Sequence, residues 1–307
     1  MPSVLMVADP GGHLALLSWL RPELGGRRVH WVSLDTPDVR SRVGTDPVVF
    51  GHGPTARAPG ALLRNLRHAR RALPTLAPDL LLTSGAGLSV PWVWAAAGLG
   101  IPTAFLEVAD RHGAPSLSAR LVAPWVDHHL VQEGPGGIGR IVPPPGPGAA
   151  RRDGPILVAL GTGPHPFDRL VRGAETLAAA GHDVLVQHGV SRAPRGCRAV
   201  PQLAPDRFRD ALQCASVVVV HGGMASRSEA AALGRVPLVV PRRAHLGEHV
   251  DDHQWDACRR DGARVVDPER LVEEVAAWVE PTPEPVDDAD ARACFRAWLA
   301  RQVPPST

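Results

Sequence analysis

The sequence predicts an α/β protein built from two doubly wound halves. Short apolar runs alternate with longer helical patterns, this rhythm stops at a stretch rich in Gly and Pro, and then it restarts. Such alternation predicts parallel sheets with helices on both faces. At about 100–200 residues per domain, 307 residues fit two domains. We expect a first domain at 1–140, a linker at 141–155, a second domain at 156–285, and a terminal helix at 286–307 that can cross back to the first domain.

In the first half, short apolar runs predict the strands, and helical spacing of apolar residues predicts the helices between them. The expected strands are 4–8, 28–33, 48–50, 80–83, 103–108 and 129–132. The expected helices are 13–20, 61–76, 90–98 and 117–125. The linker is predicted because Gly and Pro are too frequent there for the interior of an element.

The second half repeats the pattern. The expected strands are 156–160, 183–187, 199–203, 217–220, 237–240 and 263–266. The expected helices are 168–180, 206–213, 225–233, 249–261, 269–279 and 287–302. Ligands of doubly wound sheets bind beyond the carboxyl ends of the strands, so the polar segments that follow 217–220 and 237–240 are the first candidates.

Composition excludes several functions. The 33 basic residues are all Arg and face 31 acidic ones, so a net charge of +2 gives no argument for nucleic acid. Without Lys and Tyr, a Schiff-base lysine or a tyrosine acid is excluded. The four cysteines lack metal or disulfide spacing. With no signal peptide and no apolar run of transmembrane length, we expect a cytoplasmic protein.

The segment HGGMASRSEAAALG places His221, Gly222 and Gly223 at the end of an expected strand. Glycines allow the backbone to turn and to approach a ligand, and the free amides that open the next helix attract phosphate. Ser226 adds a hydroxyl, and Glu229 lies one turn further on, where a carboxylate can bind ribose hydroxyls. The alternative is an ordinary tight turn with a surface glutamate.

The segment PRRAHLGEHVDDHQ follows the next expected strand. Carboxylates and amides recognise the paired hydroxyl groups of hexoses, so we assign Glu248, Asp252 and Gln254 to the sugar of a donor. A solvated helix N-terminus is the alternative without a binding role.

A metal site is a third interpretation of the same segment. His245, His249 and His253 recur every four residues and would share one face of a helix. Gly247 is expected to precede that helix, which removes His245 from the face, so sugar binding is preferred. We expect no metal, because helix amides can neutralise a leaving diphosphate.

HGG…SEAAALGRVPLVVPR…GEHVDDHQ resembles the donor-binding C-terminal half of family 28 glycosyltransferases, which include the MurG-type N-acetylglucosamine transferases. It is similar to the catalytic subunit of the two-subunit enzyme that adds N-acetylglucosamine to a lipid-linked sugar, and to bacterial exopolysaccharide relatives. ILVALGTGPHPFDRLV resembles the opening of that subunit. This likeness implies that the turn at Gly161 and Thr162 lies against the donor diphosphate; a plain strand-to-helix turn is the alternative.

VLMVADPGGHLALL and LLTSGAGLSVPWVWAAAGLGIPTAFLEVADRHGAPSLSARL resemble the partner subunit of the same enzyme. The resemblance implies both subunits fused in one chain, with the GT-B fold of two Rossmann-like domains facing a cleft. Two features depart from the pattern. No membrane helix precedes the first strand, and the residues after Gly-Gly-His are apolar where many relatives carry Glu.

Gly11, Gly12 and His13 form the loop after the first strand. The loop can bind nucleotide phosphate, or His13 can cap a helix. A third interpretation, which the resemblance favours, places Gly11 and Gly12 against the acceptor and makes His13 the general base on the acceptor hydroxyl, because imidazole titrates near neutral pH. The matching positions of Glu107 and Arg111 imply acceptor binding, with a structural ion pair as the alternative.

The basic helix from Ala61 to Leu76 is expected to rest on an anionic membrane surface, although such faces are more often simply solvated. The resemblance implies an inverting transferase that moves a hexose, of the N-acetylglucosamine type or related, from a UDP-sugar to a polyprenyl-linked or other glycan acceptor, without a cofactor or nucleic acid. Alternatives are a UDP-sugar epimerase and a non-catalytic sugar-nucleotide-binding partner.

Overall fold

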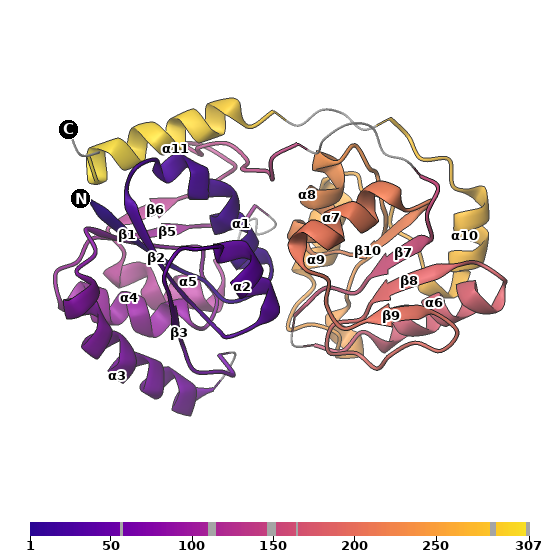
Figure 1. Cartoon of the computed structure of the whole chain (residues 1–307), viewed down its shortest axis with the longest axis horizontal. Coiled ribbons are helices and arrows are strands. Elements are labelled where there is room, and N and C mark those ends of the chain that lie inside the picture. The colour runs from indigo at the N-terminus through magenta and orange to yellow at the C-terminus, as the bar shows by residue number, and fades with distance from the viewer. Residues whose placement is uncertain (56–57, 110–114, 146–151, 164, 283–286, 305–307) are drawn as a thin grey trace. The chain divides into compact units, whose positions relative to one another are not determined.

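The computed structural model describes residues 1–55, 58–109, 115–145, 152–163, 165–282 and 287–304. The chain divides into two compact units. The first contains residues 1–141 and 287–307, and the second contains residues 142–286. Each unit has one parallel sheet with helices beside it (Figure 1), so the predicted α/β fold class is confirmed.

The first unit has a six-stranded sheet in the order β3-β2-β1-β4-β5-β6. Its strands are β1 (Ser3–Val7), β2 (Arg28–Ser33), β3 (Val48–Phe50), β4 (Leu80–Thr83), β5 (Thr103–Leu106) and β6 (His128–Leu130). The α-helices are α1 (Gly12–Leu20), α2 (Pro37–Val43), α3 (Pro59–Leu76), α4 (Ser89–Gly98), α5 (Leu117–Val122) and α11 (Ala289–Gln302). Two 3-10 turns are η1 (Arg21–Leu24) and η2 (Ala123–Trp125). Helices α3, α4 and α5 pack in succession as one layer.

The second unit has a five-stranded sheet in the order β11-β10-β7-β8-β9. Its strands are β7 (Ile156–Ala159), β8 (Val184–Gln187), β9 (Arg198–Val200), β10 (Val218–His221) and β11 (Leu238–Val240). The α-helices are α6 (Asp168–Ala179), α7 (Pro205–Cys214), α8 (Met224–Ala232), α9 (His253–Arg260) and α10 (Leu271–Ala277). Two 3-10 turns are η3 (Ala244–Leu246) and η4 (Pro268–Arg270).

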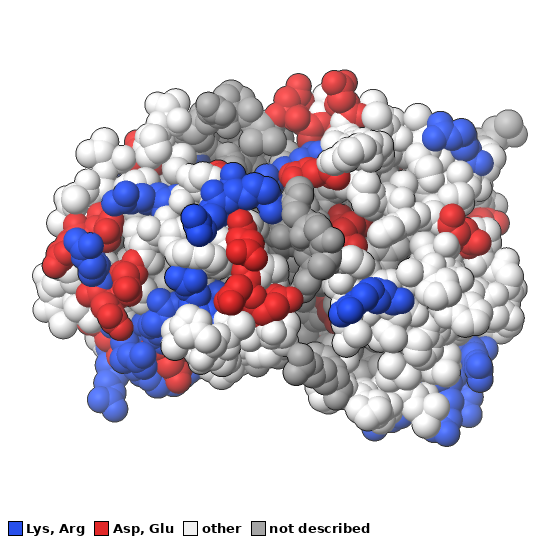
Figure 2. All heavy atoms as spheres, turned by 180° about the vertical axis from the view of Figure 1, so that it is seen from behind, with Lys and Arg blue, Asp and Glu red and all other residues white. Residues whose placement is uncertain are grey.

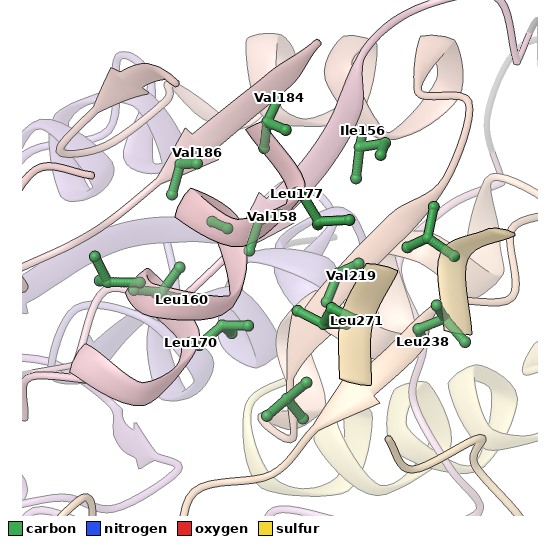
Figure 3. Packing of buried hydrophobic residues seen from close by; sticks show 14 of the residues in the cluster. Ile156, Val158, Leu160, Leu170, Leu177, Val184, Val186, Val219, Leu238 and Leu271 are labelled. Atoms are coloured by element: carbon green, nitrogen blue, oxygen red, sulfur yellow. The ribbon is translucent and has the colours of Figure 1, made fainter. Parts of the chain in front are cut away.

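Side chains of β7 alternate between two cores, as the two-residue period of a strand requires. Ile156 and Val158 pack with α6 and α10 residues such as Leu170 and Leu271 (Figure 3). Leu157 and the other alternate strand residues pack with α7, α8 and α9. The sheet is therefore buried on both faces, which explains its continuous apolar strands.

Helix α11 belongs to the first unit although it follows the second in sequence. Phe295 is fully buried, and Arg292 on α11 forms an ion pair with Glu23 of η1, with 2.9 Å between Nη1 and Oε1. The Arg27 guanidinium donates to the carbonyl of Val303 at 2.7 Å. Residues 287–304 thus complete the packing of the N-terminal unit.

Three elements differ from expectation. The predicted strand at 263–266 is not a strand, because only one bridge, Val239 to Val265, joins it to the sheet. Helix α9 begins at His253 rather than at residue 249, because residues 249–252 bend instead of continuing the helix. Helix α2 was not expected, since its apolar face consists of little more than Val39 and Val43.

Positive and negative side chains are mixed on the surface rather than gathered into separate patches. Figure 2 shows one face on which basic and acidic side chains are interspersed. In the part of the chain that the structure describes, no helix has both the length and the apolar character needed to cross a membrane.

Candidate functional site

The imidazole of His221, at the carboxyl end of β10, lies between two glycines. A Cβ atom on Gly161 would lie 2.5 Å from His221 Nε2, and one on Gly223 would lie 2.3 Å from the same atom. Both distances are too short for a side chain, so these glycines are needed to admit the ring. The loop after β7 and the loop after β10 therefore meet at His221.

Gly222 makes a similar close approach on its other side. A Cβ there would lie 2.9 Å from Pro241 Cβ and 3.1 Å from Gln254 Cβ. Neither Gly222 nor Gly223 has a positive φ, so the turn itself does not require the left-handed backbone that favours glycine. Their role is to leave room for neighbouring side chains.

Burial, and to a lesser extent the nearby Arg242 guanidinium, lower the pKa of His221 to about 3. The ring is therefore neutral at physiological pH. Its Nδ1 is buried without a hydrogen-bond partner in the structure.

Helix α8 starts directly after Gly223, and no side chain caps its first amides. Ser226 is buried in its first turn. Glu229 is 3% exposed and is paired with Arg209, so its carboxylate is already engaged by a guanidinium. A ribose would have to share Glu229 with Arg209.

The loop after β11 is held by Arg242, which is 4% exposed. Its guanidinium donates to the carbonyls of Leu160 at 2.8 Å, His165 at 2.8 Å and Pro166 at 3.0 Å. It also donates to the carbonyl of Glu248 and lies over the ring of Phe167. Burial lowers the pKa of Arg242 to about 10. One cation thus fixes the loops after β7 and β11 to each other.

Glu248 and Asp252 support the same loop. The Glu248 carboxylate accepts two hydrogen bonds from Arg169 at 2.9 and 3.0 Å, and one from the Arg243 amide. Asp252 Oδ1 accepts from the Ala244 amide at 2.8 Å. Both carboxylates hold the backbone in place before any ligand arrives.

Gln254 differs from these two acids. It opens α9 and is 6% exposed, and its Oε1 has no hydrogen-bond partner in the structure. A buried acceptor without a partner is costly, so a ligand hydroxyl or water that reached it would be stabilised.

In the first unit, His13 lies in the first turn of α1 and contacts the β4 exit. His13 Nδ1 is 2.8 Å from the carbonyl of Ser84. A carbonyl only accepts, so Nδ1 carries the proton and the lone pair of the neutral ring is on Nε2. The Gly11 amide donates to Asp38 Oδ2 at 3.1 Å, so an internal carboxylate already uses that loop amide.

Asp9 precedes this loop and connects three strand exits. Its Oδ2 accepts from Thr55 Oγ1 at 2.9 Å and from the Gly87 amide at 3.1 Å. Its Oδ1 is buried without a partner in the structure. Burial raises the pKa of Asp9 to about 6, although these hydrogen bonds oppose the shift.

Glu107 follows β5 and is 9% exposed, with Oε2 3.6 Å from His129 Nε2. Arg111, its expected companion in acceptor binding, lies outside the described residues.

Residues 156–293 match the model of the glycosyltransferase family 28 C-terminal domain. A curated protein of Verminephrobacter eiseniae (strain EF01-2), the UDP-N-acetylglucosamine--N-acetylmuramyl-(pentapeptide) pyrophosphoryl-undecaprenol N-acetylglucosamine transferase, is 29% identical over 298 residues, with 82% of this chain and 80% of that protein covered. Residues 156–293 thus resemble a family 28 glycosyltransferase C-terminal domain, and the chain as a whole is similar to a MurG-type transferase.

Solved structures place the transferase in the GT-B fold. Acinetobacter baumannii MurG matches with a TM-score of 0.57 and 19% identity over 89% of each chain. The UDP-GlcNAc 2-epimerase of Neisseria meningitidis, solved with UDP-GlcNAc, matches with a TM-score of 0.64 and 11% identity over 97% of this chain and 100% of that one. At these identities the likeness is one of fold.

The transferase therefore groups five of the expected donor residues around one strand exit: Gly161, His221, Gly222, Gly223 and Gln254. Thr162 follows Gly161 in the same loop. Sequence reasoning missed Arg242, Arg169 and Asp9. An arginine that binds carbonyls has no sequence pattern of its own, and Asp9 looks like an ordinary turn residue before Pro10 and Gly11.

Proposed function

We propose that the chain transfers an N-acetylglucosamine-type hexose from a UDP-sugar to a polyprenyl-linked or other glycan acceptor, with inversion. The observation that carries the proposal is the exit of β10, where closely packed glycines and uncapped helix amides lie inside the matched family 28 domain. The printed activity of the V. eiseniae relative supports the choice of donor and acceptor.

In the donor site, the α8 amides after Gly223 would stabilise the leaving diphosphate as its negative charge develops. Glu229 would accept hydrogen bonds from the ribose beside Arg209. Gln254 Oε1 would accept from a sugar hydroxyl, and the acids Glu248 and Asp252 would keep that loop in shape. The neutral His221 ring adds no charge beside the diphosphate.

In the reaction, the acceptor hydroxyl oxygen forms a bond to the anomeric carbon as the bond from that carbon to the diphosphate oxygen breaks. The hydroxyl proton passes to His13 Nε2, and UDP leaves with the bonding electrons. The contact from Nδ1 to Ser84 favours this role, because it holds the lone pair on Nε2. Glu107 and Arg111 are proposed to bind the acceptor near this loop.

The test compares His13→Gln with His182→Gln, a control at the amino end of β8. We expect transfer to polyprenyl-diphosphate glycans to fall by roughly 10²–10⁴ in His13→Gln, with UDP affinity unchanged. The His182→Gln variant should retain both. Stabilisation by GDP or TDP in preference to UDP would refute the donor assignment, and full transfer by His13→Gln would refute the base.

The epimerase alternative has one observation in its favour, the likeness of fold to the N. meningitidis UDP-GlcNAc 2-epimerase. It predicts conversion of UDP-GlcNAc with no acceptor present. Incubation of the enzyme with UDP-GlcNAc alone, followed by separation of the nucleotide sugars, distinguishes the two, because a transferase without an acceptor forms no epimer of UDP-GlcNAc.

Membrane contact is a further part of the proposal, with the enzyme on the cytoplasmic face. Helix α3 exposes four arginines and Leu63: Arg64, Arg67, Arg70 and Arg71. Such a face binds anionic lipid by charge and by burial of its apolar edge. Replacement of the four arginines by Gln should abolish cosedimentation with anionic vesicles, whereas binding to neutral vesicles should be weak in both proteins.

A further inference from the structure

Two histidines and an aspartate converge in the bend between η3 and α9. One potential ligand atom each from His249, Asp251 and His253 lies within 4.8 Å of the others. Among the residues that the structure describes, no other group of three His, Cys, Asp or Glu side chains comes this close. The cluster arises from the bend itself, because His249 precedes α9 and does not share a helix face with His253.

The distances suit a small divalent ion. His249 Nδ1 is 3.6 Å from Asp251 Oδ1. Ligand bonds of about 2.1 Å at tetrahedral angles separate two ligand atoms by roughly 3.4 Å, so this pair already has the spacing of one edge of a zinc site. His253 Nδ1 contacts the same Asp251 oxygen, and a metal would replace that hydrogen bond.

One nitrogen atom of His249 is available to a metal. Its Nδ1 is buried without a hydrogen-bond partner in the structure. An orphaned imidazole nitrogen beside a carboxylate is the donor arrangement that zinc prefers.

The surroundings can complete such a site. The ring of His165, from the loop after β7, lies 5.3 Å from the ring of His249 between centroids. Asp251 brings one negative charge, which offsets part of the cost of placing a cation near Arg242. Asp251 and His253 remain partly exposed, so a metal and its water have a route in.

We propose that His249, Asp251 and His253 form a Zn²⁺ site that binds metal without nucleotide and without a catalytic role. Three ligands from five consecutive residues leave a fourth position for water or for His165. Bound metal would hold the bend that precedes Gln254. The site is independent of the proposed transfer reaction, since its ligands include none of the groups assigned to donor, acceptor or base.

The experiment titrates Zn²⁺ into the full chain after removal of metal by a chelator, using calorimetry. We expect one saturable site per chain. His249→Ala and Asp251→Asn should each weaken binding by more than about tenfold, the lower limit found for partners one shell further out. The control is His245→Ala, an exposed histidine on the same loop, which should keep wild-type affinity.

Co²⁺ provides a second measurement, because its visible absorption reports nitrogen and oxygen ligation directly. The Asp251→Asn spectrum should differ from that of the wild type, and the His245→Ala spectrum should not. Asp251 is partly exposed, so this variant decides the question even if His249→Ala fails to fold. The absence of a saturable 1:1 site, or equal weakening in His245→Ala, would overturn the proposal.

Discussion

At the scale of single residues, the proposed donor site depends on the absence of side chains as much as on their presence. Gly161 and Gly223 each leave room for the ring of His221, and Gly222 for Pro241 and Gln254. The sequence marks these positions as glycines but does not say what they admit. Only the packing of the three loops shows that Gly161 and Gly223 lie against the imidazole ring of His221.

Replacement of Gly223 by Ala should therefore damage the site. The new Cβ would lie 2.3 Å from His221 Nε2, so the ring or the start of α8 must move. We expect a loss of roughly 1–3 kcal/mol of stability, as for other overpacked sites, and weaker UDP binding. Melting and calorimetry measure both. The control is Gly163→Ala on the loop after β7, where nothing lies within 4 Å of a new Cβ; equal behaviour of the two variants would disprove the argument.

Asp9 should make the first unit less stable as pH rises. Its pKa is raised from 3.8 to about 6, so between these values the folded protein binds more protons than the unfolded chain. The favourable contribution is complete below pH 3.8 and is lost as pH rises through 6. From pH 4 to 7.5 the wild type should lose roughly 2 kcal/mol relative to Asp9→Asn. Urea unfolding of both proteins across this pH range measures the difference in their free energies of unfolding. If the two free energies changed in parallel with pH, the raised pKa of Asp9 would be contradicted.

At the scale of elements, the loop after β11 is held in place by contacts with helix α6 and with the loop after β7. Arg169 at the start of α6 reaches Glu248, and Arg242 reaches the loop after β7. Sequence reasoning treated Glu248 as a ligand for sugar, because acids at strand exits often are. Its two hydrogen bonds to the half-buried Arg169, and a third to the Arg243 amide, indicate a positioning role for Glu248.

Arg169→Gln should destabilise the second unit strongly, since it leaves the Glu248 carboxylate buried without its ion-pair partner. Removal of one partner of a buried pair costs about 3–5 kcal/mol. The double variant Arg169→Gln with Glu248→Gln should recover part of that loss. On the same helix, Glu175 pairs with the exposed Arg192, and Arg192→Gln should change much less. Chemical unfolding of the wild type, Arg169→Gln, Glu248→Gln and the double variant gives the four values of the cycle, and purely additive values would contradict the coupling.

At the scale of the whole molecule, the chain contributes its last helix to its first unit. Phe295, Trp298 and Leu299 of α11 are buried, and Glu23 of η1 accepts ion pairs from α11. The stability of the N-terminal unit therefore depends on residues that follow the entire second unit in sequence.

Two matched substitutions separate the units. Phe295→Ala should lower the free energy of unfolding of the first unit, and Phe208→Ala on α7 that of the second, each by about 3–5 kcal/mol. The unfolding temperature of the affected unit should fall accordingly. Scanning calorimetry with UDP identifies the transitions, because a donor ligand stabilises only the unit that binds it. If Phe295→Ala lowered the UDP-sensitive transition instead, the assignment of α11 would be wrong.

The sequence by itself determined the two parallel sheets, most element boundaries and the strand exits at which polar groups collect. Apolar runs, helical spacing and glycine pairs are patterns among residues close together in the sequence, so they can be recognised without the tertiary structure. Tertiary structure alone decided that residue 249 lies in a bend, that residues 263–266 form only a bridge, and that Arg242, Arg169 and Asp9 join loops far apart in the chain. Burial, pKa and hydrogen-bond partners depend on which distant segments meet, and no periodicity in a single sequence records that.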